Sequence, residues 1–227
     1  MALDMLHHST IARAVRLLCQ SAVSLNVDTT PGNNQVHVGS NELFKVGDEV
    51  VLRDSAGSSE HVVDSKTGLA IVTLTGTVGD YQVSRGARLQ LANPRLPDLA
   101  WVGQGSPELL PQAPTEQFPC VLVMPGEMRQ PLNAGGNRVF QQEYTYHVFY
   151  VEEYRDGQSA NVSVLGNAET LFNLLMQDTY LGGTCWHSQV TAVDPAPAVA
   201  ERLREQERPL RVAELTLVAK RAAIWNP

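Results

Sequence analysis

The alternation of apolar and polar positions is clearest over 118–154, where two β-like runs flank a polar stretch. Residues 118–126 form a short apolar run, and large side chains alternate along 142–154 with the period of two that is typical of a strand. Two such runs predict an antiparallel strand pair. The connection between them, 127–141, is longer than the roughly 2–5 residues that a hairpin turn requires. We therefore expect a polar arm that projects from the pair and contacts another molecule.

This polar arm supplies most of the candidate contact residues. It contains two consecutive glycines, and its only basic residues are Arg129 and Arg138. The contact residues predicted on the arm are Glu127, Met128, Arg129, Gln130, Leu132, Asn133, Asn137 and Arg138. Trp101 is a further candidate for an outer contact, although a tryptophan that pins its own segment onto the domain surface is the simpler interpretation.

Hydrophobic periodicity elsewhere predicts helices that cover the strand pair. Residues 3–25 lack proline and glycine and space their apolar side chains three or four apart, which predicts an amphipathic helix. A second helix with a continuous apolar face is predicted over 164–176. Further strands are predicted over 184–193 and 210–224.

The block 35–92 has a different pattern, because short runs rich in β-branched residues alternate with glycine-containing turns. The runs are 35–38, 44–52, 60–63, 69–74 and 87–91. Strands at this close spacing predict a small all-β sandwich or barrel. Residues 93–114 are rich in proline, which predicts an extended linker.

The predicted fold class is therefore α+β. Residues 1–30 and 115–227 are expected to form an antiparallel sheet of about four strands with flanking helices. The block 35–92 is expected to be an inserted β-module, which the linker 93–114 joins to the main domain.

Composition narrows the function classes. The net charge of −7 argues against a protein that holds nucleic acid by its phosphates, although an acidic surface would let nucleic acid pass without adhering. No apolar run approaches the roughly 20 residues of a membrane span, and the N-terminus lacks a secretory signal pattern, so we expect a cytosolic chain. The 3 cysteines have no CxxC spacing and are expected to be buried thiols.

Candidate chemistry is sparse. Cys185 and His187 are two residues apart on an expected strand, which would place both on one face as a nucleophile pair or as metal ligands. No third ligand and no acid at a suitable spacing accompany them. We therefore predict no catalytic residue, no metal site and no cofactor, and we interpret His147 as a hydrogen-bonded strand histidine.

The order of elements resembles that of the tail-terminator (tail-completion) proteins of long-tailed bacteriophages. The matching segments are FPCVLV at 118–123, YTYHVFYV at 144–151, AETLF at 168–172 and RVAELTL at 211–217. The block 35–92 resembles small β-modules inserted in phage tail and baseplate proteins. Such an insertion departs from the compact form of the tail-terminator family.

The resemblance implies a structural virion protein that is not an enzyme. It implies a homo-oligomeric ring, typically a hexamer, that caps the tail tube and joins it to the head connector. The implied partners are the tail tube protein, head connector or neck proteins and the sheath protein, with DNA passing through the lumen without specific binding and no membrane contact. The implied location is the tail or neck of the virion, assembled in the host cytoplasm. Alternatives are another neck or baseplate component, such as a head–tail adaptor, or a cytosolic enzyme that uses Cys185 and His187.

Overall fold

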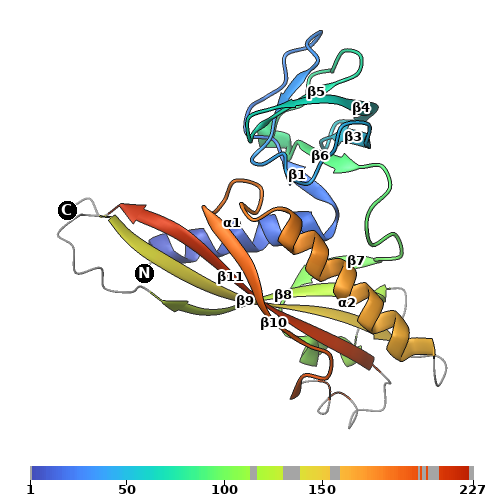
Figure 1. Ribbon diagram of the computed structural model, residues 1–227, viewed down its shortest axis with the longest axis vertical. Helices are drawn as coiled ribbons and strands as arrows, with labels where there is room; N and C mark the ends of the chain where they lie inside the picture. The colour runs from blue at the N-terminus through green and yellow to red at the C-terminus, as the bar shows by residue number, and fades with distance from the viewer. Residues whose placement is uncertain are drawn as a thin grey trace.

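The computed structural model describes residues 2–112, 117–129, 139–153, 159–198, 200, 203 and 210–224. The chain is mostly β, with 44% strand and 20% helix, and its strands form two sheets. Helices α1 (Ala2–Cys19) and α2 (Ser159–Gln177) lie against the larger assembly of long strands (Figure 1). The predicted α+β class with one four-stranded antiparallel sheet is therefore wrong.

The main sheet has five strands in the order β10-β11-β9-β8-β7. Its strands are β7 (Trp101–Gln104), β8 (Cys120–Arg129), β9 (Val139–Glu153), β10 (His187–Asp194) and β11 (Leu210–Ile224). The sheet is mixed because β7 pairs parallel with β8. The proline-rich stretch was expected to be a linker, but 101–104 contains no proline, so its N–H groups are free to join the ladder.

The two helices cover one face of this sheet. Tyr144, Tyr146 and Tyr150 of β9 point to that face and are 0–1% exposed, as are the apolar residues of β11 that alternate with its polar ones. The opposite face carries a smaller apolar cluster, over which Leu110 of the 3-10 helix η2 (Pro107–Gln112) packs. Side chains from the chain's own connections thus cover part of this second face.

The second sheet has six strands in the order β1-β6-β3-β4-β5-β2, and all of its pairings are antiparallel. Its strands are β1 (Ala22–Ser24), β2 (Gln35–His37), β3 (Glu49–Arg53), β4 (Ser58–Thr67), β5 (Ile71–Leu74) and β6 (Arg88–Leu91). A bridge between Leu25 and Val38 joins the two outer strands, so the sheet curls into a barrel.

Strand β1 comes from a segment that the periodicity assigned to the first helix. Helix α1 ends at Cys19, and Ser21 adopts a left-handed φ of 56° that turns the chain out of the helix. Ala22 and Val23 are then buried in the barrel. Short apolar runs fit either a helix or a strand, and pairing with β6 decided this one.

The barrel is joined tightly to the main domain at Gly39. A Cβ atom on Gly39 would lie 1.6 Å from the carbonyl oxygen of Gly182, so the two backbones touch. Asp178, which follows α2 and is fully buried, accepts hydrogen bonds from the N–H groups of Tyr180 and Gly182 and one from the Ser40 hydroxyl. A single apolar cluster includes residues of both helices and of the barrel. The barrel therefore shares a core with the main domain.

We predict that Gly39→Ala lowers the free energy of unfolding by about 3 kcal/mol or more, because the added methyl cannot fit without separating barrel and main domain. Gly57→Ala is the matched control, since a Cβ there meets no atom within 4 Å. Thermal unfolding of both variants checks this. Equal melting temperatures for the two variants would contradict the close contact at Gly39.

Candidate functional site

The predicted arm is shorter than the sequence suggested. Strand β8 continues through Arg129 and β9 begins at Val139, so Glu127, Met128 and Arg129 are strand residues. Glu127 and Arg129 are exposed and form an ion pair with an Nη2–Oε2 distance of 2.9 Å, which lowers the pKa of Glu127. The other predicted arm contacts, Gln130, Leu132, Asn133, Asn137 and Arg138, lie outside the described residues.

The hairpin of β8 and β9 is supported by an unusually long ladder. Strands β9 and β11 have 15 residues each and pair over their whole length without a register shift. The pairing of β8 with β9 shifts between Pro125 and Met128. Proline lacks an N–H donor and is tolerated at such a bulge, beyond the point where β7 pairs with β8. This ladder holds the hairpin end away from the barrel (Figure 1).

His147 has an acidic partner that the sequence did not reveal. Its Nδ1 lies 2.6 Å from Oε1 of Glu214, which stands on the neighbouring strand β11. The imidazole covers the β8 bulge, since a Cβ on Gly126 would lie 3.0 Å from Nε2. The expected hydrogen-bonded strand histidine is confirmed, and its partner could have been found only from the β9–β11 register, since it is 67 residues away.

Cys185 and His187 do not form the pair that strand alternation implied. Strand β10 begins only at His187, and Cys185 lies before it in a turn. The Cys185 thiol is buried and contacts the Thr179 carbonyl at 3.7 Å, whereas His187 is exposed. Burial raises the pKa of Cys185 to about 12, so the reactive thiolate is scarce at neutral pH.

Exposed large apolar side chains lie near both outer edges of the main sheet. Strand β7 forms one edge, and Trp101 at its start is 39% exposed. Its indole lies over Gly103, where a Cβ would be 2.1 Å from the ring, so this glycine makes room for a flat aromatic surface. Strand β10 forms the other edge, where Trp186 is 53% and Val193 is 46% exposed. Within the described residues, no strand pairs with the outer side of either edge.

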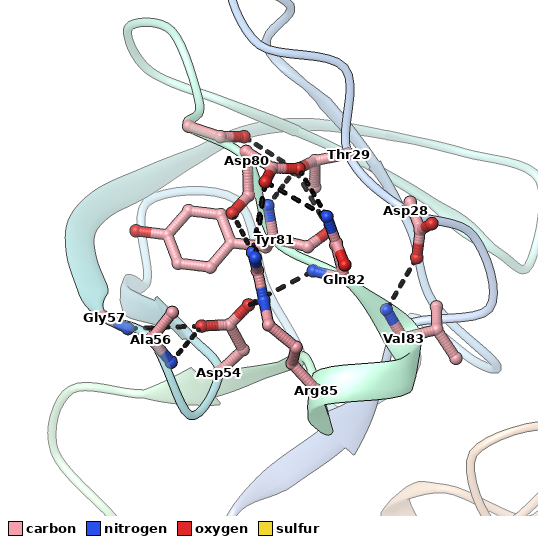
Figure 2. A network of polar contacts seen from close by, with 11 residues as sticks. Asp28, Thr29, Asp54, Ala56, Gly57, Asp80, Tyr81, Gln82, Val83 and Arg85 are labelled. Atoms are coloured by element: carbon pink, nitrogen blue, oxygen red, sulfur yellow. Dashed lines mark hydrogen bonds and ion pairs between the residues drawn. The ribbon is translucent and has the colours of Figure 1, made fainter.

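The barrel carries a polar network that holds the segment before β6 (Figure 2). Figure 2 shows Arg85 between Asp54 and Asp80, and the Arg85 Nε lies 2.6 Å from Asp54 Oδ2. Thr29 accepts a hydrogen bond from the Tyr81 N–H at 2.8 Å and donates one to the Gly79 carbonyl at 2.7 Å. These bonds connect three loops of the barrel. They have the character of a structural brace, because Arg85 pairs with both Asp54 and Asp80.

Asp54 is the buried acid of this brace, with a side chain only 1% exposed. Burial alone would raise the pKa of Asp54, but hydrogen bonds from the Ala56 N–H, the Arg85 guanidinium and the Gln82 N–H outweigh it. Together with the Arg85 charge they lower the pKa of Asp54 to about 2.

We predict that Asp54→Asn lowers the melting temperature at pH 7 and that this difference shrinks in acid. A depressed folded-state pKa stabilises the protein above the unfolded value of about 3.9, and that stabilisation is lost as pH falls toward 2. Thermal unfolding at pH 7, 5, 4, 3 and 2 measures the difference. The exposed Asp64→Asn is the control, and a difference for Asp54→Asn that stays constant from pH 7 to pH 2 would contradict the brace.

The described part of the chain shows neither a metal-binding arrangement of side chains nor a helix that could span a membrane. No group of three or more His, Cys, Asp and Glu side chains there is arranged to hold a metal ion. Neither described helix combines the length and the hydropathy that crossing a membrane requires.

Comparison with known proteins adds no identification: no protein-family model matches this chain, and no curated protein matches it.

Proposed function

We propose that this chain is a structural virion protein, a ring-forming tail terminator that caps a phage tail tube and joins it to the head connector. The observation that carries the proposal is the pair of main-sheet edges, each of which is unpaired among the described strands and carries an exposed large apolar side chain. Trp101 lies at the β7 edge, and Trp186 and Val193 lie at the β10 edge. Strands β11, β9 and β8 separate the two edge strands. A ring needs two different surfaces of this kind on opposite sides of each subunit.

Sheet edges suit the purpose because their backbone groups can pair with a neighbouring strand. An uncovered edge invites association with any strand, so proteins protect edges or use them. The last four residues of β10 are all exposed, and the strand contains a register shift at Val190 and Ala192 that limits pairing with unrelated strands. Such an edge favours one specific neighbour over unlimited aggregation.

The acidic balance of the chain agrees with a channel for DNA. A lumen lined mainly with carboxylates repels phosphates, so DNA passes without adhering. The hexameric ring, the tail tube, head connector, neck and sheath partners, and the virion location are parts of this proposal. They rest on the resemblance in element order and on the edge surfaces described above.

We predict that Val193→Lys weakens self-association by at least roughly tenfold, because a lysine at the β10 edge would have to be desolvated in the interface. Val46→Lys is the matched control, since Val46 is 66% exposed on the barrel and away from both sheet edges. Sedimentation velocity over a concentration series measures association, and electron microscopy with purified tail tubes measures capping. The proposal would be contradicted if the wild-type protein stayed monomeric at high concentration and capped no tubes.

A second prediction concerns the segment between β8 and β9. Deleting 132–136 should leave the circular dichroism spectrum and melting temperature near wild type, because the residues that remain can still join Arg129 to Val139 and both flanking strands are held by the β9–β11 and β8–β9 ladders. The deletion should weaken ring formation or docking to the head connector, measured by the same sedimentation and microscopy experiments. Unchanged assembly would remove the arm from the proposal and leave the edges as its basis.

A further inference from the structure

Several arginines converge on a cleft between the first helix and the barrel. Arg13 and Arg16 of α1 and Arg88 of β6 line a cavity of about 340 Å³, together with Gln20 and Ser24. We call this cavity the arginine cleft. Arg53 of β3 stands directly opposite Arg88 in the strand register, so a fourth positive charge borders it.

Two arginines of this cleft, Arg16 and Arg88, each have one buried side-chain nitrogen without a hydrogen-bond partner among the described residues. Buried guanidinium groups are normally paired with carboxylates or carbonyl oxygens. In Arg16 and in Arg88 this nitrogen is the Nε atom. None of the described residues that line the cleft is acidic.

The charges also repel one another. The pKa of Arg88 is lowered, first by burial and then by the nearby charges of Arg53 and Arg13. Arg16 lies in the last turn of α1, where the helix dipole favours a cation. The chain has a net charge of −7, yet the described residues that line this cleft include three arginines and no acid, so the local charge there is positive and favours an anion.

We propose that the arginine cleft binds a phosphate group, either free or carried by a small phosphomonoester. Guanidinium groups present paired N–H donors that match phosphate oxygens. The concentration of positive charge favours a dianion over a single carboxylate. The volume of the cavity is roughly ten times the ~30 Å³ that one water molecule occupies in the liquid, so the cavity has room for more than the phosphate itself. A bound anion would neutralise the repulsion and tie α1 of the main domain to β6 of the barrel.

Calorimetric titration with sodium phosphate at constant ionic strength, with chloride as the replaced anion, tests the proposal on the full chain. We expect saturable binding and a melting temperature that rises with phosphate concentration, because a ligand that binds only the folded state stabilises it. Arg88→Gln should weaken binding at least tenfold. Without phosphate, its melting temperature should equal or exceed that of wild type, because a repulsive charge has been removed.

Arg95→Gln is the control, because it removes the same charge from an exposed position that does not line the cleft, and its affinity should stay within twofold of wild type. If Arg88→Gln does not fold, Arg13→Gln on the exposed side of α1 replaces it, with the same expected loss. Titration with a nucleoside 5′-monophosphate distinguishes free phosphate from a phosphomonoester as the ligand. Tighter binding than that of inorganic phosphate assigns a phosphomonoester, and equal binding assigns free phosphate. The proposal would be overturned if phosphate did not bind saturably, or if Arg95→Gln lost as much affinity as Arg88→Gln. It would also be overturned if a glutamate-rich peptide bound to the protein while phosphate did not.

Discussion

The continuous register between β9 and β11 is the constraint on which the main domain depends. A shift of one residue would move every side chain of a strand to the opposite face. In the observed register the tyrosines of β9 and the small and apolar residues of β11 share the face beneath the helices, where they are buried. The same register sets His147 diagonally across from Glu214 on the other face. One pairing thus determines both the core and the polar surface of the sheet.

The barrel depends on this domain through a few close contacts. The backbone at Gly39 touches Gly182, and Gln177 at the end of α2 donates a hydrogen bond to the Leu43 carbonyl at 3.0 Å. Because α2 packs on β11 and β9, the position of the barrel follows from the position of the sheet. The arginine cleft lies on the α1 side of this junction. The barrel therefore meets the main domain in two places that differ in chemistry, the Gly39–Gly182 contact and the arginine cleft. One is a close backbone fit, and the other is an unbalanced positive charge.

Much of the core could be predicted from the pattern of side chains. Residues 142–154 were predicted to form a strand with alternating large side chains, and Tyr144, Tyr146 and Tyr150, which are two or four residues apart, are all buried on one face of β9. The thiols were expected to be buried, and all three cysteines are. Strand β8 continues through Arg129 into the predicted arm, and β10 begins at His187, three residues later than predicted. Two short segments, 22–24 and 101–104, were missed as strands because their few residues carry too little periodicity to define an element. Both became strands because a neighbouring strand offered hydrogen-bond partners.

The positions of apolar faces and chain breaks follow from the sequence, because periodicity and proline or glycine act locally. Which residues meet across long separations depends on the three-dimensional fold. Glu214 reached His147, Arg88 reached Arg13 and Arg16, and Trp101 and Val193 came to lie at opposite edges of one sheet. These contacts result from strand order and register, which involve partners far apart in the chain. For that reason the pattern of the hairpin could be read from the sequence, whereas the candidate sites could not.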